Sequence, residues 1–474
     1  MSFFTADNVA TVTGGRWIVA PAGDGPLRGV GIDTRTDLDG RAFVAIRGAT
    51  HDGHDFLAKA TGARVLVVDR ELNAAQLGAR TTSGVLLVND TRAALGQLAA
   101  AWRQTLTRTV VIAVTGSCGK TTVKSLLDTV LSSRLAGRAA PQSFNNDIGL
   151  PLAILAARAD DRYLVLEIGA SSPGEIGALS KIARPDIGVI TMIGRAHLQG
   201  FGSIENVTAE KATMLQYLQG RRLAVVNADA PGLRRHLHHA DHVVLFGEST
   251  DADLRLTRWT PRGDGGRFRV NDRTHFDVGL PGRHNAVNAM AVVAVARQMG
   301  FDDRDIAEAL AASRPVAMRL SRQDVGAVTF YNDAYNANPD STAASLESFI
   351  HLAADASRRV LVLGDMLELG DDAAEQHREV GRHIIELDRQ VGIDQLVLVG
   401  TLSSHTAEPI LDLWPRQRLT MVGDLDRSAA AAVAATLQPG DAVLLKGSRA
   451  LGLEAVIDAV AERQNPGPRH TLTA

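Results

Sequence analysis

The sequence predicts an α/β protein with three domains, and three observations lead to this prediction. The chain has 474 residues, which is too many for one hydrophobic core, and at about 150 residues per domain the length suggests three. Short apolar runs typical of buried strands alternate with helix-like stretches over most of the chain. One such run leads through a glycine-rich loop into a helix-like segment, which is typical of a parallel sheet with crossover helices.

Changes in this pattern divide the chain into residues 1–98, 99–312 and 313–474. In the first part, turns rich in Gly and Asp separate the apolar runs, which predicts a small α/β domain. In the other two parts, strand-like runs alternate with helical patterns or glycine loops, and the tail from Asn465 is expected to fray. The predicted strands include 42–46, 63–68, 163–168, 187–193, 223–227, 242–246, 360–363, 395–399 and 442–445.

Composition and charge exclude several classes of partner. The 50 basic and 53 acidic residues give a formal net charge of −3. Such a balance does not provide the excess of positive charge with which a protein binds nucleic acid or an anionic membrane. Cys118 is the single cysteine, so no intramolecular disulfide forms and nothing argues for an oxidising compartment. There is no secretory leader pattern and no apolar run long enough to span a membrane. We expect a cytoplasmic monomer with small-molecule partners, no nucleic acid and no membrane insertion.

A phosphate-binding loop is the strongest functional signal. Residues 115–122 have the sequence T-G-S-C-G-K-T-T and lie between the apolar run 109–114 and a helix-like segment. The two glycines let backbone N–H groups face an anion, and the helix N-terminus adds positive potential. Lys120 would contact the terminal phosphates and Thr121 would hold Mg²⁺, so a nucleotide site is favoured over a structural loop. The predicted nucleotide contacts here are Thr115, Gly116, Ser117, Cys118, Gly119, Lys120, Thr121 and Thr122.

Three further residues have the chemistry of metal ligands, and each has an ordinary structural alternative. Glu167 ends a strand-like run, where a magnesium ligand is needed beside a phosphate loop, although strand-end glutamates are as often sheet-edge residues. His197 follows another strand-like run and could bind a second metal, although a lone histidine is more often structural. Lys211 lies in a helix-like stretch, where an exposed lysine is the usual interpretation.

Polar residues later in the chain predict the rest of a ligand site. Asn285 and Asn288 begin an apolar helix-like segment and share one helix face, so they could present amides to a base, whereas N-capping would explain only one of them. Arg319 precedes a loop dense in Asn, Asp and Tyr at 331–341, which is either a turn cluster or a ligand loop. Asp333 could contact a ribose or a metal-bound water, and Arg319 a phosphate.

A basic turn follows the last strand-like run. Lys446 and Arg449 lie in the string L-L-K-G-S-R. They could bind a carboxylate. An equally plausible interpretation is that they belong to a basic turn that only contacts solvent.

Several strings together resemble the Mur ligases, ATP-dependent enzymes that form amide bonds in peptidoglycan precursor synthesis. They are Y-N-A-N-P at 335–339, L-G-D-M-L-E-L-G at 363–370, F-N-N-D-I-G-L-P-L at 144–152 and H-L-Q-G-F-G-S at 197–203. Within the family they are similar to the branch that adds D-Ala-D-Ala to UDP-MurNAc-tripeptide. The strings I-D-T-R at 32–35 and D-G-H-D-F at 52–56 are similar to the segment of these enzymes that binds the uridine nucleotide. The resemblance runs from about Gly31 to Leu453.

The resemblance implies an N-terminal UDP-sugar domain, a central P-loop ATPase domain and a Rossmann-like C-terminal domain that closes on them. It also implies that the reaction uses ATP and two Mg²⁺ ions and passes through an acyl-phosphate intermediate. Lys120 and the Mg²⁺ ions would stabilise the negative charge that develops on oxygen in each step. Lys120, Glu167, His197 and Lys211 would be catalytic, and Thr121, Glu167, His197 and a carbamylated Lys211 would ligate metal. Asn285, Asn288, Arg319 and Asp333 would contact ATP. The expected substrate contacts are Thr34, Arg35, Asp52, Asn145, Asn146, Tyr335, Asn336, Asn338, Lys446 and Arg449.

Five residues depart from the pattern of the family, and they suggest rival functions. Cys118 and Met192 each replace an Asn, Ser171-Ser172 replaces Asn-His, and Thr213 replaces a Glu. A degenerate ligase kept as a scaffold would explain such changes, but it would need none of the retained charged residues. A sister ligase of the folylpolyglutamate or cyanophycin type would share the phosphate loop, but it would lack the I-D-T-R and D-G-H-D-F strings.

Overall fold

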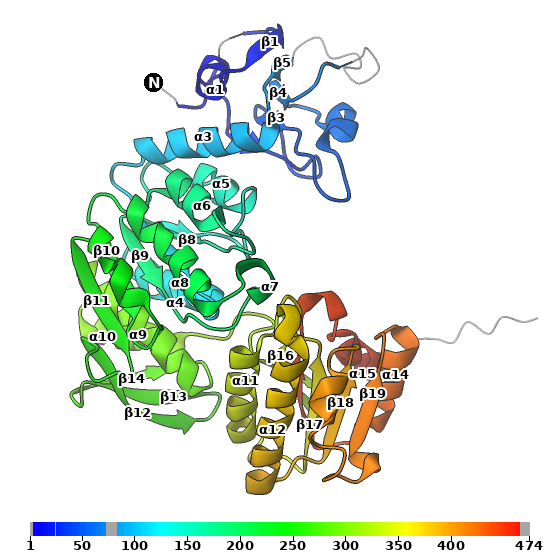
Figure 1. Cartoon of the computed structure of the whole chain (residues 1–474). Helices are drawn as coiled ribbons and strands as arrows, with labels where there is room; N and C mark the ends of the chain where they lie inside the picture. Colours follow the sequence, from blue (N-terminus) through cyan, green and yellow to red (C-terminus); the bar gives the residue numbers. More distant parts are fainter. Residues whose placement is uncertain (1–2, 24, 73–82, 465–474) are drawn as a thin grey trace, which may run out of the picture.

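The computed structural model describes residues 3–23, 25–72 and 83–464. These residues form three α/β domains in a curved row, with the central domain between the other two (Figure 1). Each domain is built around its own sheet, which is mostly parallel and packed against helices. The predicted fold class is therefore confirmed. The tail from Asn465, which was expected to fray, lies outside the described residues.

The N-terminal sheet has the strand order β1-β5-β4-β3-β2 and is parallel except for β1 at one edge. Its central strands are buried because their alternate side chains enter two separate cores. The predicted strands at 42–46 and 63–68 form β3 and β4. The elements are α1 (Ala6–Thr13), β1 (Arg16–Val19), β2 (Val30–Gly31), β3 (Ala42–Val44), η1 (Gly53–Lys59), β4 (Val65–Val68) and β5 (Gly84–Leu87).

Helix α3 (Thr91–Thr105) joins the first two domains. Asp90 caps the helix by accepting hydrogen bonds from the backbone N–H groups of Arg92 and Ala93. The helix packs against α1 on one side and against α5 and α6 of the central domain on the other, so one apolar core runs through both domains. The predicted boundary after residue 98 thus falls inside a helix and not in a linker, because the buried face of α3 serves two sheets.

The central sheet has the order β14-β13-β12-β11-β10-β9-β6-β8-β7. Strands β7 to β12 are parallel, and β13 and β14 add an antiparallel edge. Because β6 lies between β8 and β9, the carboxyl ends of these three strands surround the point where the chain switches direction across the sheet, which is where ligands bind in such folds.

Helices α4, α9 and α10 pack over one face of the central sheet, around a core of aliphatic and aromatic side chains. The elements are β6 (Val110–Thr115), α4 (Lys120–Ser132), β7 (Gly137–Ala139), α5 (Gly149–Leu155), β8 (Tyr163–Glu167), α6 (Glu175–Ala183), β9 (Ile187–Ile190), α7 (Leu198–Phe201), α8 (Ile204–Ala212), η2 (Thr213–Tyr217), β10 (Leu223–Asn227), η3 (Leu233–His239), β11 (His242–Gly247), β12 (Leu254–Arg262), β13 (Gly265–Val270), β14 (Thr274–Val278), α9 (Arg283–Gln298) and α10 (Asp303–Ala312).

The C-terminal sheet has the order β15-β16-β20-β17-β18-β19, with β15 antiparallel at one edge. One apolar core lies between its strands and α11 and α12, and another lies between its strands and α14 and α15. The elements are β15 (Ser321–Val325), β16 (Val328–Asp333), α11 (Pro339–Leu352), β17 (Arg358–Gly364), η4 (Gly370–Asp372), α12 (Ala373–Val391), β18 (Gln395–Val399), α13 (Ser404–Ala407), η5 (Arg416–Arg418), β19 (Leu419–Val422), α14 (Arg427–Thr436), β20 (Asp441–Lys446), η6 (Arg449–Leu451) and α15 (Ala455–Gln464). Within the described ranges, no helix combines the length and apolar character needed to cross a membrane.

Candidate active site

The predicted phosphate loop connects β6 to α4 and is pressed between neighbouring elements. Gly116 and Gly119 have φ angles of +152° and +85°. A Cβ atom would lie 1.9 Å from Thr191 Oγ1 at position 116, and 2.4 Å from Asn288 Oδ1 at position 119. Only glycine fits such positions, because both the left-handed backbone and the lack of space exclude a side chain. The loop can therefore bring its backbone close to an anion at the N-terminus of α4.

Lys120 begins α4 and folds back over this loop. Its Nζ donates a hydrogen bond to the carbonyl of Gly116 at 2.8 Å. Burial lowers the pKa of Lys120, and the nearby Glu167 and Cys118 act in the opposite direction. A cation that is poorly hydrated and held at the mouth of the loop is suited to bind phosphate oxygens.

Glu167 is the buried acid at the end of β8, and its carboxylate is held by three side chains. Thr121 Oγ1 donates to Oε2 at 3.1 Å, Asn145 Nδ2 donates to Oε1 at 3.0 Å, and Lys124 Nζ lies 3.3 Å from Oε2. The Thr121 hydroxyl and the Glu167 carboxylate are hard oxygen donors in contact with each other, so they fit a magnesium site.

Lys124 was missed by the sequence analysis. It is 4% exposed and forms a buried ion pair with Glu167. Its position four residues after Lys120 was an available signal, since residues at this spacing share one face of a helix.

The other two predicted metal ligands lie near Lys120, in different surroundings. His197 Nδ1 pairs with Glu368 of the C-terminal domain. The pKa of His197 is lowered mainly by burial and, to a smaller extent, by the nearby charge of Lys120. Lys211 is 1% exposed. Burial, as the larger cause, and the nearby charge of Lys120 lower the pKa of Lys211 to about 7. In the part of the chain that the structure describes, no three His, Cys, Asp or Glu side chains gather as a ready metal site.

Asn285 and Asn288 lie together on the first turns of α9, as the spacing predicted. Asn288 Nδ2 donates to Asn285 Oδ1 at 3.1 Å, and Asn285 Nδ2 donates to the carbonyl of Pro281 at 2.7 Å. Both residues are buried and line the same cavity as the phosphate loop. Their mutual hydrogen bond fixes which amide edge each side chain presents.

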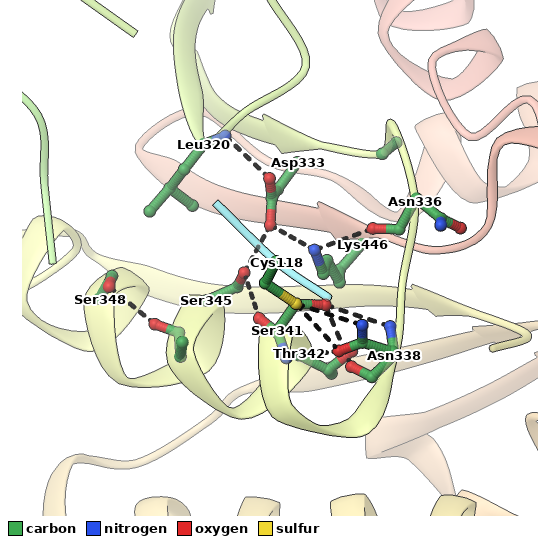
Figure 2. Close-up of polar contacts among 12 residues, drawn as sticks. Cys118, Leu320, Asp333, Asn336, Asn338, Ser341, Thr342, Ser345, Ser348 and Lys446 are labelled. Atoms are coloured by element: carbon green, nitrogen blue, oxygen red, sulfur yellow. Dashed lines mark hydrogen bonds and ion pairs between the residues drawn. The ribbon is translucent and has the colours of Figure 1, made fainter. Parts of the chain in front are cut away.

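The C-terminal domain supplies a second group of predicted residues, of which Figure 2 shows Asp333, Asn336, Asn338 and Lys446. Lys446 Nζ lies 2.6 Å from Asp333 Oδ2. The guanidinium of Arg319 stacks 4.1 Å from the ring centroid of Tyr335, and its Nη2 lies 3.5 Å from Thr121 Oγ1 in the central domain. Arg319 therefore reaches the phosphate loop from across the domain boundary, as expected.

Two further contacts close the C-terminal domain onto the central one. Asn338 caps α11 and contacts Cys118, with its Nδ2 3.2 Å from the sulfur (Figure 2). Arg195, in the loop after β9, forms an ion pair with Asp340 in the first turn of α11 and with Glu379 of α12. The sequence analysis missed the arginine contacts, because residues 145 positions apart in the chain carry no local signal of their pairing.

One cavity of about 1190 Å³ lies between the central and C-terminal domains. It brings together most of the predicted nucleotide and metal residues and several predicted substrate residues. Those in its wall are Ser117, Cys118, Gly119, Lys120, Thr121, Thr122, Asn145, Asn146, Glu167, His197, Asn285, Asn288, Arg319, Asp333, Tyr335, Asn336, Asn338 and Lys446.

Seven predicted residues do not line this cavity. Thr115 ends β6 and Gly116 follows it, Lys211 is buried in α8, and the side chain of Arg449 is half exposed and pairs with Glu454. Thr34, Arg35 and Asp52 belong to the N-terminal domain, of which no described residue reaches the cavity wall.

Arg35 and Asp52, two of the predicted N-terminal residues, have partners inside their own domain. Arg35 forms three side-chain hydrogen bonds with Asp33, and this contact lowers the pKa of Asp33 to about 2. Asp52 caps η1 and contacts the ring of buried His54 at 2.6 Å. Their predicted role in substrate binding thus concerns a different surface from the cavity.

Apart from Cys118, the residues that depart from the family pattern contact other residues of the central domain. The N–H of Ser117 donates to the carbonyl of Met192, and the N–H groups of Ser171 and Ser172 donate to Glu175. Thr213 Oγ1 donates to the carbonyl of Glu210. At Met192 the contact uses a main-chain atom, and the residue also lines the cavity.

The fold and the site are those of a three-domain P-loop protein in which the C-terminal domain contacts the phosphate loop of the central domain. Residues 26–103 match the Mur ligase family catalytic domain, residues 114–296 the Mur ligase middle domain, and residues 318–449 the Mur ligase glutamate ligase domain. The chain belongs to the Mur ligase family.

Individual relatives match over nearly their whole length. The chain is 34% identical to the UDP-N-acetylmuramoyl-tripeptide--D-alanyl-D-alanine ligase of Bacillus subtilis (strain 168), over 92% of this chain and 93% of that protein. A crystal structure of MurF from Acinetobacter baumannii has a TM-score of 0.83 at 29% identity, covering 97% of this chain and 99% of that one. The MurF ligase of Thermotoga maritima, solved in complex with ADP, has a TM-score of 0.77 at 27% identity, covering 93% and 98%.

Proposed function

We propose that this chain is an ATP-dependent amide ligase that joins D-Ala-D-Ala to UDP-MurNAc-tripeptide in the cytoplasm. The products are UDP-MurNAc-pentapeptide, ADP and phosphate, so the reaction belongs to peptidoglycan precursor synthesis. The observation that carries the proposal is the single cavity that joins the phosphate loop to the Y-N-A-N-P loop of the C-terminal domain. The near-complete coverage of the relatives supports the choice of substrates.

The chemistry needs charge stabilisation more than a covalent nucleophile. The tripeptide carboxylate attacks the γ-phosphate and ADP leaves, which gives an acyl phosphate. The amine of D-Ala-D-Ala then attacks the acyl carbon and gives up a proton to solvent, and the bond from this carbon to the phosphate oxygen breaks, so that phosphate leaves. Lys120, the loop N–H groups and Arg319 surround the place where negative charge develops in the first step, so they serve as its electrostatic stabilisers.

Magnesium fits the oxygen donors of the cavity. Thr121 and Glu167 would hold one ion, and Asn145 and Lys124 orient the Glu167 carboxylate toward the hydroxyl. Bound there, the ion would neutralise phosphate charge. His197 is the proposed nitrogen donor of a second site, and the interdomain pair with Glu368 fixes its ring.

We assign a carbamate to Lys211 as part of the same proposal. Burial leaves much of this amine neutral near pH 7, and neutral amines are the form that reacts with CO₂. No described residue forms a hydrogen bond or an ion pair with its ammonium group, so the amine is available for the modification. Carbon-13 NMR of the protein in ¹³C-bicarbonate tests this: a carbamate signal is expected in the wild type and not in Lys211→Met.

The remaining predicted residues would bind the two substrates. Thr34, Arg35 and Asp52 are assigned to the uridine nucleotide. Asn145 and Asn146 lie in the cavity wall beside Glu167 and are assigned to the peptide. Tyr335, Asn336 and Asn338 line the cavity and are assigned to the incoming dipeptide, as is Arg449.

Phosphate release from ATP tests the proposal directly. Purified protein is given UDP-MurNAc-tripeptide with D-Ala-D-Ala, with D-Ala alone or with no acceptor, using tripeptides that end in diaminopimelate or in lysine. We expect release only when a tripeptide and the dipeptide are both present. Release with D-Ala alone, or none with any combination, would refute the proposed acceptor or the proposed activity, respectively.

A further inference from the structure

Lys446 is a buried lysine whose ammonium group contacts protein acceptors. The residue is 2% exposed, and Nζ lies 2.6 Å from Asp333 Oδ2 and donates to the carbonyl of Asn336 at 2.9 Å. Strands β16 and β20 are parallel neighbours in which Asp333 and Lys446 are register partners. The sheet therefore places the two charges side by side at its carboxyl edge (Figure 2).

Asp333 in turn connects three segments of the C-terminal domain. Its Oδ1 accepts a hydrogen bond from the N–H of Leu320 at 3.1 Å, and its Oδ2 accepts one from Ser345 Oγ of α11 as well as contacting Lys446. Figure 2 shows these contacts converging on the one carboxylate. With both oxygens engaged, the carboxylate acts as a rigid anchor.

The anchored turn is the one that presents Arg319. Met318 and Leu320, on either side of Arg319, have φ angles of +60° and +54°. Such left-handed conformations are unfavourable for residues with side chains and persist where the surroundings hold them. The hydrogen bond from the Leu320 N–H to Asp333 holds this turn, and Arg319 extends from it to Tyr335 and Thr121.

We propose that Lys446 is a positioning residue for the nucleotide, because through Asp333 it fixes the turn that aims Arg319 at the phosphate loop. The inference rests on the proposed function, since it places ATP at that loop. It differs from a direct role of Lys446 in holding a substrate carboxylate.

Among the residues that the structure describes, Lys446 is the cation that forms an ion pair with Asp333. His284 of α9 faces the same pair, and burial, together with the charge of Lys446 and against that of Asp333, lowers the pKa of His284 to about 4, so beside Lys446 the ring is neutral near pH 7. Without Lys446, Asp333 would be a buried carboxylate with no opposing charge, and such a group is strongly destabilised. The charge of Lys446 is therefore what holds the anchor in place.

The test measures ADP binding by the full chain in the presence of Mg²⁺, with calorimetry and no other substrate. Lys446→Met is expected to weaken ADP binding about tenfold, the scale of one lost charge-assisted hydrogen bond. Lys446→Arg, which retains the charge, should weaken it less. Arg427→Met removes an exposed cation of the same domain, which pairs with Glu462, and it should leave ADP binding unchanged.

A double-mutant cycle separates positioning from general damage. Arg319→Met should weaken ADP binding by a similar factor, and combining it with Lys446→Met should add little, because both remove the same contact. Fully additive losses would overturn the inference. If Lys446→Met does not fold, Lys446→Gln, whose amide can still donate to Asp333, carries the same test.

Steady-state kinetics complete the test. In Lys446→Met the KM for ATP should rise while the KM for D-Ala-D-Ala stays the same, and the reverse pattern would assign Lys446 to the substrate carboxylate and overturn the inference. If the wild type does not bind ADP, the proposed function itself fails. If the wild type binds ADP and Lys446→Met binds it equally well, only the role of Lys446 fails.

Discussion

The two walls of the cavity are built in different ways. The central-domain wall is a backbone structure, in which glycines and a helix N-terminus form the cradle and one lysine folds over it. The C-terminal wall consists of side chains held by other side chains, and its ion pair joins residues 113 positions apart. A backbone cradle requires a short string of residues in order, whereas a side-chain network requires only that the fold bring its members together. The predictions below test this difference.

The largest effect is expected from Lys120→Ala. Removing the cation proposed to face the phosphates should lower phosphate release by about a thousandfold, because charge that develops on oxygen would lose its main stabiliser. Binding of UDP-MurNAc-tripeptide, measured by calorimetry, should be unchanged if the N-terminal domain binds the nucleotide sugar by itself. Lys181→Ala, at an exposed position on α6, serves as the control, and equal loss of binding and turnover in Lys120→Ala would contradict this separation.

The next effect concerns how stability depends on pH at Lys211. Burial lowers the pKa of Lys211 from 10.5 to about 7. Between these values the unfolded chain binds a proton that the folded chain does not, so the stability that this group contributes rises with pH, by up to about 1.4 kcal/mol per pH unit.

Urea unfolding of the wild type and Lys211→Met, in CO₂-free buffer, checks this expectation. The free energy of unfolding of the wild type, minus that of the variant, should increase from about pH 7 upward and level off near 10.5. A difference that does not change with pH would mean that Lys211 is solvated in the folded protein.

Gly119→Ala should break the backbone cradle specifically. The new Cβ would meet Asn288 Oδ1 at 2.4 Å, and the φ of +85° strains any side chain. Gly174→Ala is a matched control, because Gly174 has a φ of +89° and also begins a helix, but no atom lies within 4 Å of its added Cβ. Both should lose about 1 kcal/mol of stability, and only Gly119→Ala should lose ADP binding. Equal ADP binding by the two variants would show that the cradle tolerates a side chain.

Arg195→Met tests the contact between the two walls. The guanidinium pairs with Asp340 and Glu379 and is partly buried, so its loss should cost about 1 kcal/mol of domain closure and raise the KM for ATP several-fold. Arg378→Met removes an arginine whose partners lie within the C-terminal domain, and it is the control. A KM change of the same size in both variants would assign the effect to surface charge alone.

Cys118→Asn should have the smallest effect. The thiol contacts Asn338 across the domain boundary, and sulfur forms weak hydrogen bonds, so we expect less than about a twofold change in the KM for ATP. Because Cys118 lines the cavity, saturating Mg-ATP should slow its alkylation in the wild type. An alkylation rate that is independent of Mg-ATP would place the nucleotide elsewhere.

The sequence predicted the central wall well because its signals are local. Strand β6, the loop and α4 are contiguous, and the spacing of Asn285 and Asn288 is a property of one helix. Lys124 shows the limit of this approach: its helical spacing from Lys120 was visible, but its burial against Glu167 depends on β8, which lies in another part of the chain.

For the C-terminal wall, the sequence analysis predicted which residues belong to the site but not how they contact one another. Arg319, Asp333 and Lys446 were each selected, but their separate roles followed from residue chemistry and family resemblance. The register of β16 with β20 decides that Asp333 and Lys446 bind each other, and a strand register cannot be obtained from either strand alone.

The sequence by itself determined the α/β class, the phosphate loop and the membership of the chain in its family, because these depend on periodicity, glycine positions and contiguous strings. The tertiary structure alone decided which buried charges face one another, where α3 fuses two cores, and that Lys446 supports Asp333 beneath Arg319. The physical reason is that the strength of a charge or hydrogen bond depends on burial and partner distance, and long-range packing sets both of them.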